Sequence, residues 1–152
     1  MKKVLIVGLG NIGCGYDYEE NHVEGNKMKN DILTHASASY TNPLIELVGA
    51  IDPDSQCRQK FENKYGKSTF KSIKESAYKT NALAINIIIV CVPTKLQKEA
   101  IDEILMYYNP EILLLEKPIG RNLRESIEIL NTLKTSKAKI IAVNYIRRYL
   151  PA

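Results

Sequence analysis

Short runs of apolar, mostly β-branched residues recur along the chain, and a stretch with the spacing of an amphipathic helix separates each run from the next. The runs are continuous rather than alternating, which is typical of strands buried on both faces. Such strands occur in parallel sheets whose crossover helices cover both sides. We therefore expect an α/β fold, a doubly wound parallel sheet of about six strands. The expected strands are residues 3–7, 47–51, 87–92, 112–115 and 139–143, with a weaker one at 68–70.

Length and composition restrict the class of protein. The 152 residues suffice for one domain with an ordinary core. The net charge of +4 is spread along the chain and no apolar run is long enough to cross a bilayer, so neither nucleic acid nor a membrane is an expected partner. Cys14, Cys57 and Cys91 are too far apart for a disulfide framework or a metal site. These features favour a cytoplasmic protein without a metal.

Two stretches predict helices with recognisable ends. Asp54 is expected to cap a helix that Gly66 ends. Asn122, with Glu125 three residues later, predicts a capping box at the start of another helix. The expected buried stripe of this second helix consists of Leu123, Ile127, Leu130 and Leu133.

One polar segment differs from the rest of the chain. Residues 17–31 contain almost nothing to bury, although they follow a buried strand and a glycine-rich turn. A long loop in a compact domain is usually a lid, a binding loop or a disordered segment. We expect an inserted loop here, close to whatever the glycine turn binds.

The sequence GLGNIG at residues 8–13 follows directly after the first expected strand. This spacing is weak evidence by itself, but its position after a buried strand is that of a dinucleotide cradle. Gly8 would permit the tight turn, Gly10 the close approach of backbone to a pyrophosphate, and Gly13 the packing of helix against strand. Amides near Asn11 and Ile12, where a helix is expected to begin, would bind the phosphates. The alternative is a strand-to-helix turn without a ligand.

Asp52 ends the second expected strand and is the candidate acceptor for the ribose hydroxyls of an adenosine. It lies 39 residues after Gly13 rather than about 20, and the excess is about the length of the polar segment. A carboxylate here accepts a diol and repels a 2′-phosphate, so NAD is favoured over NADP. Arg58 keeps NADP open, although it fits a solvated helix charge better. The alternative for Asp52 is a turn and helix cap before Pro53.

Glu116, Lys117 and Pro118 follow directly after a buried strand, so both charges must be exposed at the sheet edge or paired. Ligands bind at this edge in doubly wound folds. Desolvation there would lower the pKa of a lysine, which could then exchange a proton with a substrate hydroxyl or carbonyl while hydride moves to nicotinamide. A loop ion pair before a proline explains the same residues equally well.

Five motifs in this order, GLGNIG, AIDPD, CVPT, EKPIG and NYIRRYLP, resemble the N-terminal domain of the Gfo/Idh/MocA oxidoreductase family, which includes glucose-fructose oxidoreductase and inositol dehydrogenase. The resemblance covers nearly the whole chain. It implies a Rossmann domain that binds NAD(P) and, in the full protein, oxidation or reduction of a hydroxyl of a sugar, cyclitol or related small molecule. It also implies a homo-oligomer when full length, and a second domain that would begin where this chain ends.

The resemblance assigns roles to single residues. Lys117 matches the lysine taken as catalytic in the family, and Glu116 would orient it. Residues 93–94 match a loop that lines the cofactor, and Asn144 and Arg148 match a segment that approaches the nicotinamide. The predicted cofactor-binding residues are therefore Gly8, Leu9, Gly10, Asn11, Ile12, Gly13, Asp52, Cys91, Pro93, Thr94, Gln97, Glu116, Lys117, Asn144 and Arg148.

The chain also departs from the family pattern. Gln97 stands where the family commonly has a histidine, so an amide would replace an imidazole contact. His35 matches a histidine that family members often carry on the first helix, and we interpret it as structural. Without the second domain, this chain alone is expected to be inactive. A second hypothesis is a nucleotide-binding sensor without catalysis, which gives no reason for Lys117. A Rossmann methyltransferase fits less well, since it needs a looser glycine turn.

Overall fold

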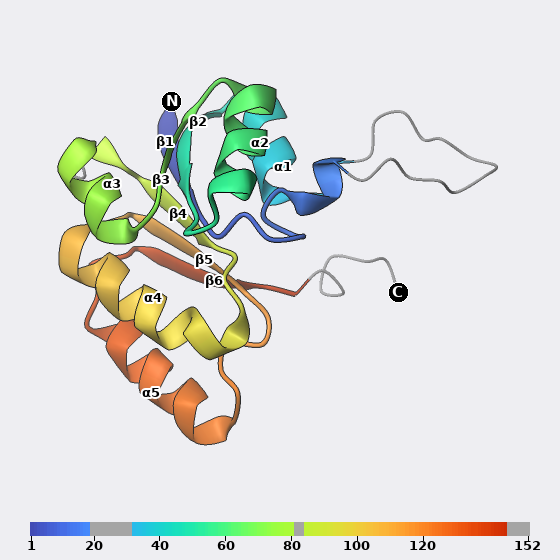
Figure 1. Ribbon diagram of the computed structural model, residues 1–152. Helices are drawn as coiled ribbons and strands as arrows, with labels where there is room; N and C mark the ends of the chain where they lie inside the picture. The colour runs from blue at the N-terminus through green and yellow to red at the C-terminus, as the bar shows by residue number, and fades with distance from the viewer. Residues whose placement is uncertain (19–31, 81–83, 146–152) are drawn as a thin grey trace, which may run out of the picture.

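The computed structural model describes residues 1–18, 32–80 and 84–145 (Figure 1). It contains a six-stranded sheet in the order β3-β2-β1-β4-β5-β6, and every neighbouring pair of strands is parallel. This confirms the predicted α/β doubly wound fold. The strands are β1 (Lys2–Val7), β2 (Ile45–Ile51), β3 (Ser68–Phe70), β4 (Ile87–Val90), β5 (Ile112–Glu116) and β6 (Ile140–Asn144).

Helices cover both faces of this sheet (Figure 1). They are α1 (His35–Thr41), α2 (Ser55–Tyr65), α3 (Ile73–Lys79), α4 (Thr94–Tyr107) and α5 (Leu123–Lys134). Val4 and Ile6 of β1 belong to the apolar cluster under α1 and α2, whereas Leu5 and Val7 belong to the cluster under α3, α4 and α5. Because neighbouring strand residues are buried on opposite faces, the strand sequences are continuously apolar.

The predicted helix ends are confirmed. Asp54 Oδ1 accepts a hydrogen bond from the Gln56 amide at 2.7 Å, and Gly66 ends α2 with a φ of +62°. Asn122 Oδ1 accepts a hydrogen bond from the Glu125 amide at 3.0 Å, which confirms the cap, but the Glu125 carboxylate accepts the Arg121 amide at 2.6 Å in place of the Asn122 amide that a capping box would use. Each cap provides a partner for an amide that the first turn of its helix leaves unpaired.

The predicted buried stripe of α5 is wrong for three of its four residues. Leu123, Ile127 and Leu130 are exposed, at 77%, 48% and 46%. The buried apolar residues of this helix are Ile129 and Leu133, at 0% and 2%. The helix carries apolar residues on two flanks, and packing against the sheet and α4 covers only one of them.

The helix expected directly after the glycine turn is interrupted. Gly15–Tyr18 form a 3₁₀ helix, η1, and the regular helix α1 begins only at His35. The amides of His35 and Ala36 donate hydrogen bonds to the carbonyls of Ile12 and Gly13, both at 3.0 Å. These two bonds join α1 to the glycine turn, so the inserted segment interrupts the first helix instead of following it.

Asp17 is the first residue of the expected polar loop at 17–31, of which residues 19–31 lie outside the described residues. Contrary to the expected loop character, the Asp17 side chain is held by the domain. Its Oδ2 accepts hydrogen bonds from Thr34 Oγ1 at 2.6 Å and from the Tyr65 hydroxyl at 2.5 Å. Burial and the bond to Asp17 raise the pKa of the Tyr65 hydroxyl, so it stays a donor. Asp17 therefore connects η1 to the start of α1 and the end of α2.

Replacing Asp17 with Ala should lower the free energy of unfolding by about 2–3 kcal/mol, because the hydroxyls of Thr34 and Tyr65 then lack their carboxylate acceptor. Both residues are buried, at 3% and 6% exposure. Urea unfolding followed by circular dichroism measures the loss. Asp102→Ala removes only an exposed pair with Lys98 on α4 and should cost at most about 0.5 kcal/mol. Equal losses in the two variants would contradict the anchoring role of Asp17.

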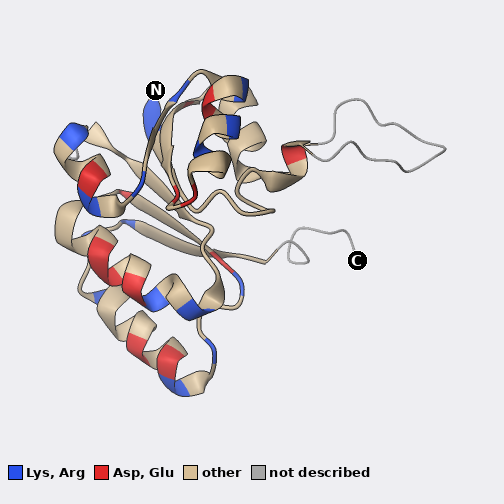
Figure 2. Cartoon of the chain, in the orientation of Figure 1, with Lys and Arg blue, Asp and Glu red and all other residues tan. Residues whose placement is uncertain are grey.

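Both acidic and basic side chains lie on α4 and on α5 (Figure 2). Cys14, Cys57 and Cys91 are free thiols. None of the described helices is long and apolar enough to cross a membrane. Within the described ranges, no group of three or more His, Cys, Asp or Glu side chains is arranged to hold a metal ion.

Candidate functional site

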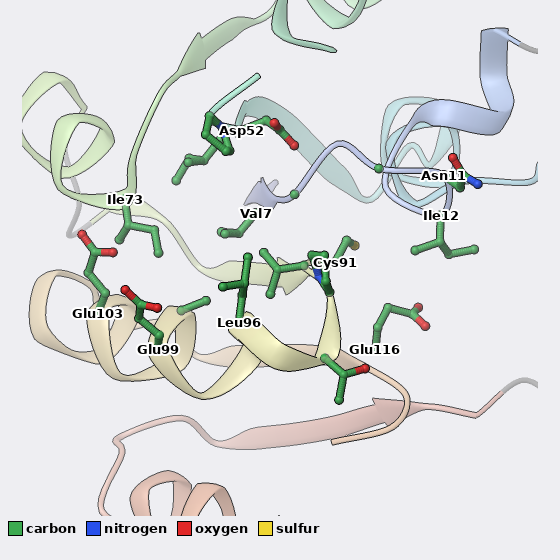
Figure 3. A pocket seen from close by; sticks show the side chains of 18 of the residues that line it. Val7, Asn11, Ile12, Asp52, Ile73, Cys91, Leu96, Glu99, Glu103 and Glu116 are labelled. Carbon is green, nitrogen blue, oxygen red and sulfur yellow. The ribbon is translucent and has the colours of Figure 1, made fainter. Parts of the chain in front are cut away.

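A cavity of about 930 Å³ lies at the carboxyl ends of strands β1 to β5 (Figure 3). Among the described residues, Leu9, Gly13, Gln97 and Asn144 of the predicted set do not line it, and Arg148 lies outside the described ranges. The fold nevertheless joins four separate segments of the prediction in one site. The predicted residues that line the cavity are Gly8, Gly10, Asn11, Ile12, Asp52, Cys91, Pro93, Thr94, Glu116 and Lys117.

Close backbone contacts explain two of the three glycines in the turn. Gly8 has a φ of +97°, and a Cβ there would lie 2.8 Å from the Cys91 carbonyl oxygen. A Cβ on Gly13 would lie 2.2 Å from the Gly8 carbonyl oxygen. A Cβ on Gly10 would meet nothing within 4 Å. Gly8 thus allows the turn to pack against the end of β4, and Gly13 allows the turn to pack against its own backbone. Gly10 leaves open the space beside the turn in which a phosphate would lie.

Asp52 is fixed by the backbone around it. Its Oδ2 accepts a hydrogen bond from the Leu9 amide at 2.7 Å, and its Oδ1 accepts one from the Asp54 amide at 2.8 Å. The first bond connects the end of β2 to the glycine turn despite the long insertion between them. The predicted cradle and the predicted carboxylate therefore face the same cavity, and Leu9 contributes through its amide.

Arg58 differs from the solvated helix charge that the sequence favoured. Its Nη1 donates hydrogen bonds to the carbonyls of Asp52 and Pro53, both at 2.8 Å. The guanidinium therefore stabilises the turn that follows β2.

Glu116 is held by two side chains from distant parts of the chain. Its Oε1 lies 2.7 Å from His35 Nε2 and accepts a hydrogen bond from Asn144 Nδ2 at 2.6 Å. The His35 and Glu116 side chains are only 12% and 13% exposed. Burial by itself would raise the pKa of Glu116, but the hydrogen bonds from His35 and Asn144 outweigh it and lower the pKa. His35, interpreted from sequence as structural, therefore contacts a carboxylate that lines the cavity.

The orientation of Lys117 by Glu116 does not appear in the structure. Within the described residues, the carboxylate of Glu116 faces His35 and Asn144 instead. Successive residues of a strand point to opposite faces, and Glu116 points to the face that carries α1. Lys117 lines the cavity and is exposed, so the desolvation expected from its position is also absent.

Gln97 supports the site from behind. It is 1% exposed, and its Nε2 donates a hydrogen bond to the Glu116 carbonyl at 2.8 Å. Its Oε1 is buried without a hydrogen-bond partner among the described residues. The amide thus fixes the end of β5 from α4, and it does not reach the cavity as the predicted cofactor contact would.

The site combines a glycine turn, a fixed carboxylate after the next strand and a charged strand end in one cavity. The family model described as an oxidoreductase family with an NAD-binding Rossmann fold matches residues 2–145. The chain belongs to the Gfo/Idh/MocA oxidoreductase family. This match confirms the resemblance inferred from the five motifs and the presence of an NAD(P)-binding Rossmann domain.

Solved structures similar to this Gfo/Idh/MocA domain include several dehydrogenases. Myo-inositol 2-dehydrogenase from Lactobacillus plantarum is 22% identical, with a TM-score of 0.72 over 98% of this chain and 38% of its own. Scyllo-inositol dehydrogenase from Lactobacillus casei is 17% identical, with a TM-score of 0.72 over 99% and 38%. The WlbA dehydrogenase from Chromobacterium violaceum, in complex with NADH and UDP-GlcNAcA, is 18% identical, with a TM-score of 0.72 over 97% and 36%.

At sequence identities of 17% to 22%, the similarity to these three dehydrogenases shows a shared fold and nothing more specific. The chain spans between 36% and 38% of the length of these three dehydrogenases. No curated protein sequence matches the chain significantly.

Several residues that line the Gfo/Idh/MocA cavity were not predicted. Residues 71–73 are the link between β3 and α3 and the first residue of α3, and Leu96, Glu99 and Glu103 lie along one side of α4. Figure 3 shows Glu99 and Glu103 projecting from α4 on the side of the cavity where Ile73 lies. The carboxyl end of the weak strand at 68–70 was the available signal for residues 71–73, since ligands bind at that edge of the sheet. For α4, the signal was the spacing of Leu96, Glu99 and Glu103 at three and four residues, which places them on one side of a helix.

Proposed function

We propose that the chain is the cofactor domain of an oxidoreductase that transfers hydride between a nicotinamide cofactor and a hydroxyl or carbonyl group of a sugar, cyclitol or related small molecule. The observation that carries the proposal is one cavity lined by the glycine turn, Asp52 and Lys117. The inositol dehydrogenases with the same fold support this substrate class. We further propose that the full-length protein is a cytoplasmic homo-oligomer and that the present chain alone is inactive.

NAD is the proposed cofactor, in preference to NADP. Both oxygens of Asp52 accept backbone amides, which fixes the carboxylate and leaves lone pairs for the two hydroxyls of a ribose. A 2′-phosphate would meet this negative charge. Arg58 does not line the cavity, and its Nη1 is engaged by two backbone carbonyls, so it is not placed to bind that phosphate. The open space at Gly10 fits a pyrophosphate that crosses the turn.

Lys117 is the proposed proton carrier. Bound NAD would supply the hydride acceptor for oxidation of an alcohol. As a carbonyl carbon accepts hydride, the ammonium of Lys117 would donate a proton to the carbonyl oxygen, and oxidation of an alcohol would return that proton to the neutral amine. The exposed position of Lys117 on the cavity wall leaves room for a substrate beside it. The sensor hypothesis has no use for a proton carrier at this position.

Isothermal titration of the chain with NAD, NADH and NADP tests the proposal. NAD and NADH should bind, and NADP should bind at least about tenfold more weakly because of the charge of Asp52. Asp52→Ala should weaken NAD binding by about ten- to a hundredfold, since hydrogen bonds to a charged acceptor contribute about 1.5–3 kcal/mol. The same variant should bring the affinities for NAD and NADP closer together.

Asp54→Ala provides the matched control. It removes the N-terminal cap of α2, at a cost of about 1 kcal/mol in stability, and leaves the carboxylate of Asp52 in place. Its affinity for NAD should stay within about twofold of the unmodified chain. No binding of any dinucleotide at millimolar concentration, or equal weakening in both variants, would contradict the assignment of this cavity.

A further inference from the structure

The order of strands places Glu116 and Asp52 at opposite ends of the cavity. Asp52 follows β2, Gly8 follows β1, Cys91 follows β4 and Glu116 ends β5, and these strands are consecutive in the sheet. A dinucleotide with its adenosine ribose on Asp52 and its pyrophosphate on the glycine turn therefore extends toward Glu116 with its nicotinamide. Glu116 is a fixed carboxylate in this part of the cavity wall.

We propose that the pair formed by His35 and Glu116 biases the cavity toward the oxidised cofactor, and that protonation of His35 removes this bias. The inference rests on the proposed function, because it takes the ligand to be NAD(H). The oxidised nicotinamide ring carries a positive charge and the reduced ring is neutral, while the rest of the cofactor keeps the same charge. A negative charge beside the ring therefore favours only the oxidised form.

The charge of the pair depends on His35 alone. With neutral imidazole the pair carries one negative charge, and with imidazolium it carries none. Among the residues that the structure describes, the other groups that face Glu116 do not change charge near neutrality. Asn144 from β6 is an amide, and burial raises the pKa of the Cys91 thiol at the end of β4. Lys117 adds a positive charge to the same wall, which acts against the oxidised ring but leaves the effect of His35 protonation unchanged in sign.

The side-chain geometry couples the two charges closely. His35 Nε2 and Glu116 Oε1 are 2.7 Å apart, and both side chains are nearly buried, so solvent screens the pair weakly. Asn144 Nδ2 lies 2.6 Å from the same oxygen and fixes the carboxylate whether or not His35 is protonated. Protonation therefore changes the charge at the cavity wall and leaves the acceptor in place.

The test measures dissociation constants of NAD, NADH and ADP-ribose at a series of pH values between 5.5 and 8.5. The ratio of the NADH constant to the NAD constant should fall by about fivefold from the upper to the lower pH, as expected for a unit charge several ångströms from the ring at a partly screened site. ADP-ribose lacks the nicotinamide, so its dissociation constant should not follow this change.

Three variants separate charge from structure. His35→Gln keeps an amide that can donate to Glu116 but does not titrate, so the ratio should stay at its high-pH value throughout. Glu116→Gln removes the negative charge, so the ratio at pH 8.5 should already be as low as that of the unmodified chain at pH 5.5. His22→Gln replaces the chain's other histidine and should keep the pH dependence of the unmodified chain. Thermal unfolding of each variant verifies that it is folded before binding is measured.

A ratio that does not change with pH in the unmodified chain, or that still changes with pH in His35→Gln, would overturn the inference. So would a ratio in Glu116→Gln equal to that of the unmodified chain at pH 8.5. These outcomes leave the proposed function intact, because they require that NAD, NADH and ADP-ribose bind. Failure of all three ligands to bind at any pH would instead refute the proposed function.

Discussion

Gly13→Ala should lower the free energy of unfolding by about 3–5 kcal/mol, at the upper end of what single substitutions cost. The new Cβ would lie 2.2 Å from the Gly8 carbonyl oxygen. That oxygen belongs to the backbone of a turn that is itself packed against the end of β4, so it cannot move aside cheaply. Urea unfolding followed by circular dichroism measures the change.

Gly10→Ala is the matched control for the same substitution in the same turn. Its Cβ meets nothing within 4 Å, so the unfolding free energy should stay within about 1 kcal/mol of the unmodified chain. NAD binding should nevertheless weaken at least about tenfold, because the methyl group takes up space that the pyrophosphate needs. Two equally destabilised variants, or unchanged NAD binding in Gly10→Ala, would refute this division of roles between the glycines.

Ile129→Ala should lower the free energy of unfolding by about 3 kcal/mol. Ile127→Ala, two residues earlier on α5, should lower it by less than about 1 kcal/mol. Ile129 is fully buried in the core, whereas Ile127 is 48% exposed. The two variants delete the same atoms from the same helix, so the difference in their unfolding free energies reports burial. If Ile127→Ala were the more costly of the two, α5 would have to be rotated from the orientation described.

The strands could be predicted because their signal is local. Four of six residues in β1 are buried, and both faces of the sheet require apolar side chains, so a continuous run marks each strand. The helix caps at Asp54 and Asn122 could be predicted for the same reason, since a cap side chain bonds to backbone amides only two or three residues away.

The face of α5 could not be predicted in the same way. Its sequence has apolar residues on two flanks, and only the packing of the helix against the sheet decides which flank is buried. Periodicity identifies a helix reliably but does not identify its neighbour. The stripe based on Leu123, Ile127 and Leu130 followed the wrong flank for this reason.

The site was predictable in composition but only partly in geometry. The glycine turn and Asp52 meet across the insertion as expected, because each position follows from the end of a strand. The contact between His35 and Glu116 joins residues 81 positions apart, and no spacing rule indicates it. The interruption of the first helix is also non-local, since hydrogen bonds from His35 and Ala36 to the glycine turn define it.

The hydrogen bond from the Leu9 amide to Asp52 has a thermodynamic consequence for any ligand that touches both. The turn and the carboxylate are already immobilised relative to each other before a ligand arrives, so binding does not have to order them. Preorganised sites retain more of their gross interaction energy as affinity, because less conformational entropy is lost on association. The same bond also keeps the two halves of the recognition surface at a fixed spacing, which selects ligands by length as well as by charge.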